Sequence, residues 1–161
     1  MNCKKNILLV RAHRGDDELV RQLDGAMIKV LCIPITRIEE IKQDEHIKIN
    51  ILDFEHCDIA IFVSVNAARI GLSLLEKYRP ILPQHMAYLA IGAQTAKCVS
   101  DHNLKVISPS LETTEGLLSL RALKDVRSKR IIIFRGQGGR EKLACELVKR
   151  GAQVTYSEVY R

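Results

Sequence analysis

The sequence predicts an α/β fold organised around a parallel β-sheet, and three observations carry this prediction. Strand-like and helix-like segments alternate about five times along the chain. Two of the strand-like segments, residues 59–63 and 131–134, are uninterrupted apolar runs, which are typical of parallel strands covered by helices on both faces. Small and hydroxyl-bearing residues follow several of these segments, as they do where a strand leads into a helix.

Several segments have the composition of β-strands. They comprise residues 6–11, 29–35, 58–64, 86–91, 105–108, 130–135 and 153–160. The helix after the first of them is expected to be capped by Asp16 or Asp17. Its apolar stripe is expected to consist of Leu19, Val20, Leu23 and Met27.

Later helices are marked at their ends as well. The segment T-E-G at residues 114–116 precedes an apolar stripe, and a helix over residues 140–150 is expected to bury Leu143, Ala144, Leu147 and Val148. Gly151 stands where a left-handed C-terminal cap belongs, and Asn103 has the same expected role after a helix over residues 92–102. Residues 35–44 interrupt the alternation, so we expect an extended crossover from one sheet to another there.

The composition argues against several classes of protein. The sequence contains no run of about 20 apolar residues, so we expect no membrane span. The first apolar segment is too short for the core of a signal peptide, which favours the cytoplasm. A formal net charge of +6 suits an anionic partner. We do not expect a nucleic-acid partner, because only 4% of the residues are aromatic and a single-strand platform needs exposed rings.

The cysteines and histidines predict no metal site. The five cysteines form no C-x-x-C pair, and the five histidines lack the spacing of metal ligands. We therefore expect reduced thiols, with Cys32 and Cys98 in hydrophobic cores.

Four helix N-termini are expected along one rim of the sheet. The segments concerned are S-V-N-A at residues 64–67, G-A-Q-T-A at 92–96, P-S with T-E-G between 109 and 116, and R-G-Q-G-G-R-E at 135–141. The carboxyl ends of parallel strands share one edge, where the following helices present backbone N–H groups and positive dipole ends. Such a rim suits several carboxylates or phosphates.

The glycine-rich segment at residues 136–141 does not complete a nucleotide-binding motif. Glu141 occupies the place of the third glycine of the dinucleotide fingerprint, the segment follows a late strand, and no phosphate-loop Gly-Lys-Ser/Thr is present. A tight strand-to-helix turn that needs glycine explains these residues equally well. In the same way, Ser64 and Thr95 can be helix caps and Tyr160 a core or interdomain residue.

Taken in order, these segments resemble the uroporphyrinogen-III synthase family. The start I-L-L-V-R-A-H at residues 7–13 is similar to the family's I-L-V-T-R-P, with Arg11 retained and with departures at Val10 and Ala12. The segments at 62–67, 90–96 and 109–118 are similar to F-T-S-x-N-A, A-I/V-G-x-x-T-A and P-x-x-x-x-S/T-E-G-L-L. The most specific are the segments at 135–141, 150–154 and 158–161, which resemble R-G-x-G-G-R-E, R-G-A-x-V and E-x-Y-R.

The resemblance implies the two-domain parallel-sheet fold of this family, in which the first domain is discontinuous. Residues 1–35 would open the first domain, residues 36–158 would form a complete second domain, and residues 159–161 would begin the return to the first. The rest of the first domain in the family pattern lies beyond Arg161. We therefore expect a partial first domain and a chain truncated by its C-terminal third.

The activity that the resemblance implies is closure of hydroxymethylbilane, a polycarboxylate, to uroporphyrinogen III with loss of water and inversion of the terminal pyrrole ring. It implies no cofactor, because the substrate supplies the electrons, and a monomer when the enzyme is complete. Tyr160, in the E-x-Y motif, is the expected catalytic residue. The expected substrate-binding residues are Arg11, Ser64, Asn66, Gly92, Thr95, Ser110 and Gly138.

Two other classes of function stay open. One is a non-catalytic module of the same fold, or an inactive fragment of the synthase, that holds an anion at the helix N-termini. The other is a nucleotide-binding regulatory domain, against which the incomplete phosphate-loop motif counts.

We expect that this chain alone does not direct ring closure. Residues 1–34 supply only strand, helix and strand, which bury too little surface to offset an ordering entropy of about 1–2 kcal/mol per residue. The resemblance implies a cleft between the two domains, which would lack its opposite wall here, so spontaneous closure to the unrearranged isomer should prevail. Incubation with hydroxymethylbilane and separation of the product isomers measures this. A clear excess of the type III isomer would contradict the expectation.

Overall fold

The computed structural model describes residues 6–10, 18–41, 44–79 and 81–161. The chain divides into a small unit, Met1–Glu39, and a large unit, Glu40–Arg161. The small unit is a strand–helix–strand motif, in which β1 (Asn6–Val10) and β2 (Lys29–Ile33) pair in parallel and α1 (Glu18–Gly25) lies between them in sequence. Along β1, half-buried and exposed side chains alternate, so the unit itself partly covers one face of this small sheet.

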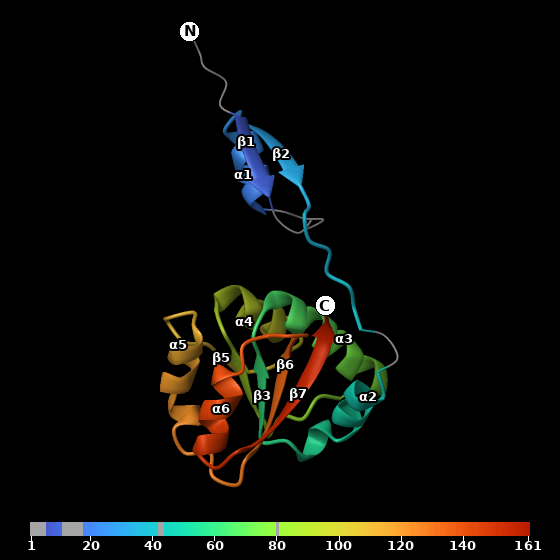
Figure 1. The fold of residues 1–161 in the computed structure, drawn as a ribbon, viewed down its shortest axis with the longest axis vertical. Helices are drawn as coiled ribbons and strands as arrows, with labels where there is room; N and C mark the ends of the chain where they lie inside the picture. The colour runs from blue at the N-terminus through green and yellow to red at the C-terminus, as the bar shows by residue number, and fades with distance from the viewer. Residues whose placement is uncertain (1–5, 11–17, 42–43, 80) are drawn as a thin grey trace. The chain divides into compact units, whose positions relative to one another are not determined.

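A five-stranded parallel sheet organises the large unit (Figure 1). The strands stand in the order β5–β4–β3–β6–β7. Their bounds are Ile59–Phe62 for β3, Ala87–Ala90 for β4, Val106–Ile107 for β5, Arg130–Gly136 for β6 and Gln153–Tyr160 for β7. All these pairings are parallel, so the carboxyl ends of the strands lie along one edge of the sheet.

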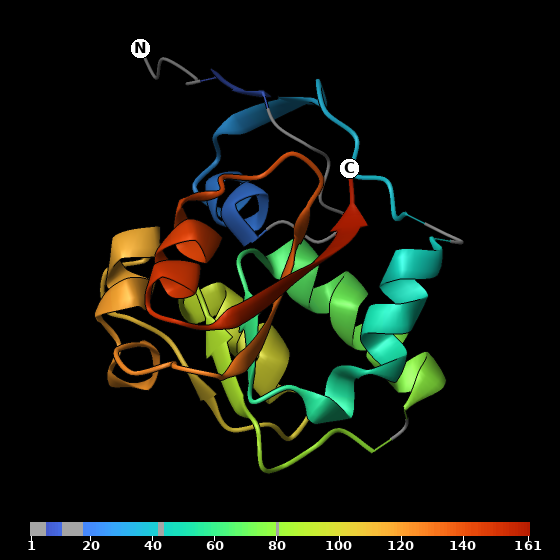
Figure 2. The same ribbon diagram turned by 60° about the horizontal axis from the view of Figure 1, so that its bottom comes forward.

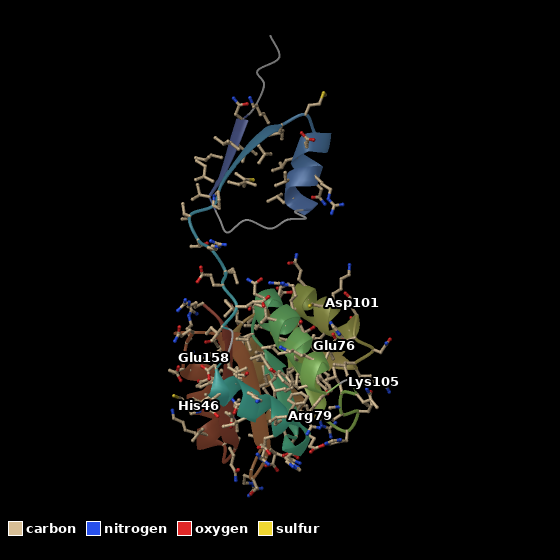
Figure 3. The ribbon with its side chains drawn as sticks, turned by 90° about the vertical axis from the view of Figure 1, so that its right-hand side faces the viewer. His46, Glu76, Arg79, Asp101, Lys105 and Glu158 are labelled. Carbon is tan, nitrogen blue, oxygen red and sulfur yellow. The ribbon has the colours of Figure 1, made fainter. Side chains whose placement is uncertain are left out.

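Helices cover both faces of this sheet (Figures 1 and 2). On one face lie α2 (Glu45–Leu52), α3 (Val65–Tyr78) and α4 (Ala93–Ser100), and on the other lie α5 (Thr114–Ser119) and α6 (Lys142–Lys149). Two short 3-10 helices, η1 (Phe54–His56) and η2 (Arg121–Leu123), complete the unit. Figure 3 looks onto the side of α2 and α3, where charged side chains such as Glu76 and Arg79 are found. None of the helices within the described residues has the length and apolarity needed to span a membrane.

Hydroxyl side chains fix where two of these helices begin. Ser64 Oγ accepts the backbone N–H of Ala67 at 3.0 Å at the start of α3, and Thr113 Oγ1 accepts that of Gly116 at 3.1 Å at the start of α5. Each cap satisfies an N–H group that the helix itself leaves without a partner. The caps therefore anchor the strand-to-helix turns at the carboxyl edge of the sheet.

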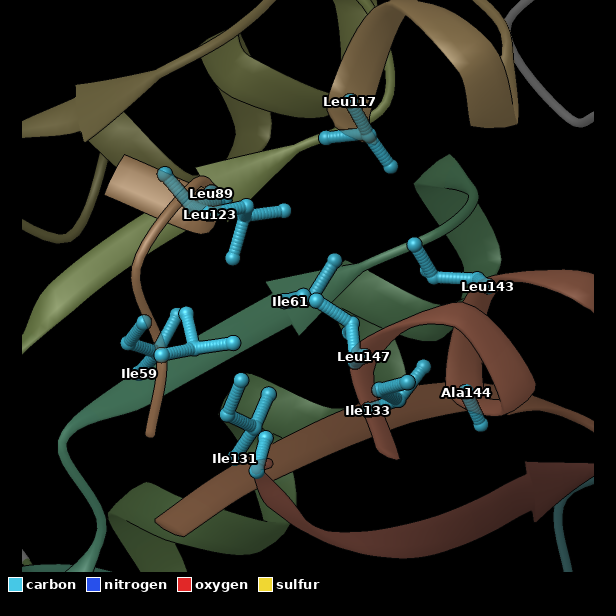
Figure 4. Packing of buried hydrophobic residues seen from close by; sticks show 12 residues of the cluster. Ile59, Ile61, Leu89, Leu117, Leu123, Ile131, Ile133, Leu143, Ala144 and Leu147 are labelled. Atoms are coloured by element: carbon cyan, nitrogen blue, oxygen red, sulfur yellow. The ribbon is translucent and has the colours of Figure 1, made fainter. Parts of the chain in front are cut away.

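The core between the sheet and helices α5 and α6 is built from the apolar runs seen in the sequence (Figure 4). Alternate strand residues reach this face, and its buried members include Ile59, Ile61, Leu89, Leu117, Leu123, Ile131, Ile133, Leu143 and Leu147. On the opposite face, Phe62 stacks on Phe134 with ring centroids 4.8 Å apart. Gly71 of α3 makes room there, because a Cβ atom would lie 2.6 Å from the Phe134 ring.

The predicted parallel sheet covered on both faces is confirmed for the large unit, mostly with shorter strands. β7 has the predicted bounds, whereas β2 ends at Ile33. Asn103 and Gly151 have the predicted left-handed conformation, with φ of 59° and 87°. Residues 34–39 form neither helix nor strand, and Glu40 makes an antiparallel bridge with Tyr160. The proposed caps Asp16 and Asp17 lie outside the described residues.

Predictions about four side chains were wrong. Met27 is not part of the α1 stripe, because the helix ends at Gly25 and Met27 is exposed with φ 56°. Val148 lies on the outer surface of α6, since Leu143, Ala144 and Leu147 already fill the arc that faces the sheet. Cys32 is exposed because a two-stranded sheet has too few neighbours to bury it, and Cys98 is only half-buried.

Ser157 on β7 offers a test of the packing on the α2 and α3 side. Its side chain is fully buried, and Oγ has no hydrogen-bond partner among the described residues. Since a buried hydroxyl without a partner is costly, Ser157→Ala should raise the free energy of unfolding by about 1 kcal/mol. Urea denaturation measures the change. Ser119→Ala, which removes a hydroxyl bonded to the Gly116 carbonyl, is the control and should bring no gain. A clear loss of stability in Ser157→Ala would show that its hydroxyl is paired.

Candidate active site

The sheet changes direction at β3, which places a crevice at its carboxyl edge. From β3 the chain moves outward through β4 to β5 and then returns to the other side of β3 for β6 and β7. As a result α3, which follows β3, and α6, which follows β6, leave neighbouring strands on opposite faces. In open α/β sheets such a reversal is where ligands bind.

A cavity of about 490 Å³ lies at this edge of the large unit. The last residues of the central strands form its floor, and the glycine-rich turn after β6 and the start of α5 form its walls. Its lining includes Val63, Ile91, Thr113, Glu115, Arg135, Gly136, Gln137, Gly138, Gly139, Arg140, Tyr156 and Tyr160. Backbone at Gly138 has φ 73°, the left-handed conformation that favours glycine, so the turn itself requires this residue.

Tyr160 reaches across the edge from the end of β7 to the start of α3. Its hydroxyl lies 3.0 Å from Ser64 Oγ, and its backbone carbonyl accepts the N–H of Gln137 at 2.8 Å. A register shift pairs Arg135 with Glu158 but Gly136 with Tyr160. The Tyr160 ring rests on the backbone of Gly136, where a Cβ atom would lie 2.7 Å from two ring carbons. Glycine at this position therefore lets the phenol ring pack closely against β6.

Beneath the glycine-rich turn lies a buried charge. Only 7% of the Arg135 side chain is exposed, and its Nη2 bonds to Glu141 Oε1 at 2.7 Å and to Glu158 Oε1 at 2.8 Å. Its guanidinium carbon lies 3.9 Å from the ring centroid of Tyr156, which in turn donates its hydroxyl to Glu141 Oε2 at 2.7 Å. Cation–π and charge-assisted contacts of this kind gain strength where water is excluded. The cluster ties the turn, α6 and β7 together.

These contacts shift the titration of two groups in the cluster. The hydroxyl of Tyr156, together with the Arg135 guanidinium, holds the pKa of Glu141 below its usual value. Burial, followed by the hydrogen bond to Glu141, raises the pKa of Tyr156. Glu141 is therefore ionised and Tyr156 neutral at physiological pH, as their hydrogen bond requires.

The chain's own carboxylate already occupies one of the helix N-termini expected to bind anions. Glu112 Oε1 accepts the backbone N–H of Ala93 at 2.7 Å, at the first turn of α4. The carboxyl group stands where a side chain at Gly92 would be, so only glycine leaves room for it. The start of α4 thus binds a carboxylate from within the molecule, by the contact that helix N-termini make with anions.

The predicted site residues that reach the cavity itself are Tyr160 and Gly138. Ser64 and Asn66 stand at the start of α3, half-buried, and Ser64 touches the cavity only through Tyr160. Arg11 lies outside the described residues.

The remaining predicted residues lie away from the cavity lining. Gly92 caps α4 and faces Glu112. Thr95 is 4% exposed and points into the body of the unit instead of the cavity. Ser110 is exposed in the turn after β5, beside a separate hollow of about 250 Å³.

Sequence reasoning assigned no role to Arg135, Glu141, Tyr156 or Glu112. The arginine and Glu141 stand inside the most specific motif, R-G-Q-G-G-R-E, and an arginine at the end of a buried apolar run is itself a signal of a paired buried charge. Tyr156 and Glu112 carry no signal of this kind, since their roles depend on residues far away in sequence. Among the described residues, no group of histidine, cysteine and carboxylate side chains could hold a metal ion.

Comparison with known proteins agrees with this architecture along nearly the whole chain. The family model described as uroporphyrinogen-III synthase HemD matches residues 17–161. The uroporphyrinogen-III synthase of Proteus mirabilis is 29% identical over 160 residues, which are 97% of this chain and 79% of that protein. The enzyme of the same name from Escherichia coli K12 is 29% identical over 158 residues, which are 97% of this chain and 64% of that protein.

A solved structure has the same fold. The chain superposes on a mutant uroporphyrinogen III synthase from the extremely thermophilic bacterium Thermus thermophilus with a TM-score of 0.73 and 16% sequence identity. The match covers 98% of this chain and 62% of that one. The chain thus spans less than two thirds of the length of this structure and of the Escherichia coli relative.

The Arg135 cluster predicts a specific loss of stability in acid. Because the folded pKa of Glu141 is lowered, its stabilising contribution is fully present above its unfolded pKa of about 4.3 and is lost as pH falls through the folded pKa. The difference in Tm between the wild type and Glu141→Gln should therefore be largest near neutral pH and shrink on acidification. Tyr156→Phe removes the largest cause of the shift and should move this loss to higher pH. Parallel curves of Tm against pH would contradict the assignment.

Proposed function

Because the chain belongs to the uroporphyrinogen-III synthase family, we propose that it supplies the Tyr160-bearing domain of an enzyme that closes hydroxymethylbilane to uroporphyrinogen III. The observation that carries the proposal is the position of Tyr160. This residue, which matches the family's E-x-Y motif, lines the cavity at the reversal of the sheet with its hydroxyl held by Ser64. A phenol at this place can donate a proton to a substrate that enters the cavity.

The surroundings of the cavity suit a polycarboxylate. The chain has a formal net charge of +6, which suits an anionic substrate. The glycine-rich turn and the exposed Arg140 line the same cavity. The positive guanidinium of Arg135 is already balanced by two carboxylates, so its role is to hold the turn and not to bind the substrate.

The reaction requires the protein to hold the substrate in position and to supply one proton. Breakage of the C–O bond of the hydroxymethyl group leaves a protonated azafulvene cation that the pyrroles stabilise, and the departing oxygen takes the Tyr160 proton to leave as water. The terminal ring then attacks through its substituted carbon and is inverted through a spiro intermediate. Holding the bilane folded lowers the entropy cost of this attack. The proton released as the attacking pyrrole regains its aromaticity restores the phenol.

The proposal includes three finer points. The enzyme needs no cofactor, because the substrate supplies the electron pair for its own ring closure. It acts as a monomer, since one large unit contains Tyr160, Ser64 and the glycine-rich turn. It works in the cytoplasm, which is the compartment that the composition favours.

A chimera tests the function. In it, the 64% of the Escherichia coli enzyme that matches this chain is replaced by this chain. The chain alone and the chimera are incubated with hydroxymethylbilane, and the type I and type III products are separated. Circular dichroism checks that both are folded. The proposal predicts type III product from at least the chimera, and two folded proteins that both give only type I would refute it.

Tyr160→Phe should slow turnover by about 10- to 1000-fold, because it removes the one positioned proton donor while keeping the ring. The KM should change little, since the ring still fills its place on Gly136. Steady-state kinetics of whichever protein forms type III product measures both constants. Tyr78→Phe, at the exposed end of α3, is the matched control and should be unchanged. An unaltered kcat in Tyr160→Phe would make Tyr160 a structural residue.

A further inference from the structure

The hydroxyl groups of Ser64 and Tyr160 form the middle of a chain of hydrogen bonds that starts at a helix. The N–H of Ala67 donates to Ser64 Oγ at 3.0 Å, and Ser64 Oγ lies 3.0 Å from the hydroxyl of Tyr160, a residue that lines the cavity. Both side chains are half-buried. Either hydroxyl can be the donor in the contact between them, so the direction of this bond decides where the Tyr160 proton points.

The start of α3 decides that direction. Ser64 Oγ already accepts a hydrogen bond from the Ala67 N–H in the first turn of the helix, and it lies at the positive end of the helix dipole. Both effects make this oxygen a weaker acceptor and its O–H a stronger donor, because successive hydrogen bonds polarise one another. The favoured arrangement therefore has the Ser64 proton on the line to Tyr160, and the proton of the phenol turned away from Ser64.

We propose that Ser64 is a positioning residue that directs the proton of Tyr160 into the cavity, where the hydroxyl of the substrate leaves. The proposal rests on the proposed function and assigns Ser64 a role other than the substrate binding expected from the sequence. Ser64 does not touch the substrate, and it acts by keeping the phenol proton free for transfer. When that proton leaves, the bond from Ser64 stabilises the phenolate oxygen through α3.

The chemistry of the step is balanced by groups that are present. The carbon–oxygen bond of the hydroxymethyl group breaks, its electron pair stays with oxygen, and the Tyr160 proton completes a water molecule. The negative charge left on the phenolate is held by the Ser64 O–H, whose own oxygen keeps the bond from Ala67. The proton that the pyrrole releases on ring closure returns to the phenolate. Ser64 neither loses nor gains a proton over the cycle.

Neutron diffraction from deuterated crystals of the chain tests the direction without any assay of activity. We expect the Ser64 deuteron on the line to Tyr160 Oη and the Tyr160 deuteron turned toward the cavity. A Tyr160 deuteron that lies on Ser64 Oγ would overturn the proposal. This result stands whether or not the chain forms type III product, so failure of the proposed function and failure of this inference are distinguished.

Substitutions at Ser64 distinguish its role toward Tyr160 from its role as the cap of α3. They are made in whichever protein forms type III product. Ser64→Ala and Ser64→Gly both remove the hydroxyl, but glycine keeps most of the stability of an N-cap and alanine does not. Both should lower kcat about 10-fold with an unchanged KM, and Ser64→Thr should restore kcat. In a Tyr160→Phe background, Ser64→Ala should have no further effect on kcat. A loss of kcat that follows the Tm of the variants, or that persists in the Tyr160→Phe background, would refute the proposal.

Gly136→Ala tests the contact while both hydroxyl groups stay in place. The new methyl group would lie 2.7 Å from the Tyr160 ring, so the ring must shift, and we expect this shift to disturb the contact of its hydroxyl with Ser64. We expect the kcat of Gly136→Ala to fall as in Ser64→Ala. Gly25→Ala, where a methyl group meets nothing within 4 Å, is the control and should keep the wild-type kcat. A Gly136→Ala variant with wild-type kcat would overturn the proposal.

Discussion

The buried guanidinium of Arg135 is the constraint on which the carboxyl edge of the sheet depends. A charge with so little exposure must be compensated where it lies, and Glu141 and Glu158 do this from two different elements. One belongs to the start of α6 and the other to β7, two residues before Tyr160. Because both carboxylates bond the same guanidinium, the turn and the strand are held in a single arrangement. The position of the phenol is therefore set by an ion pair that takes no part in the chemistry.

A second constraint comes from the order of the strands. Because β3 and β6 are neighbours whose following helices leave on opposite faces, the turns after them open outward and the edge is hollow there. Two glycines then make room for side chains at this edge. Gly136 lets the Tyr160 ring lie on the backbone, and Gly92 lets the Glu112 carboxylate reach the start of α4. The Arg135 cluster and Gly136 together hold the Tyr160 side chain in a fixed position beside the cavity.

The fold could be predicted from the sequence where a signal is local. Apolar runs such as residues 131–134 and left-handed ends such as Gly151 depend on neighbours in the chain, and the structure has them. The helix α2 gave no clear signal, because only Ile47 and Ile51 mark its buried face. Cys32 was misjudged because an apolar strand predicts burial only if enough other elements pack on it. Gly138 and Tyr160 at the cavity could be found through motifs, whereas Tyr156 and Glu112 depend on contacts between distant segments.

The alternation of side chains along β7 has a consequence for how this strand can diverge between related proteins. Tyr156, Glu158 and Tyr160 point to one face, where they meet Arg135 or Ser64, while Ser157 and Val159 are fully buried on the other. Insertion or deletion of one residue would exchange the two sets and bring a carboxylate into the apolar interior. The length of β7 is therefore fixed by the side chains on both faces, but the identity of each residue is not. Positions 157 and 159 can accept other residues of similar volume. Positions 156, 158 and 160 are more restricted, because their side chains make specific contacts with Arg135 or Ser64.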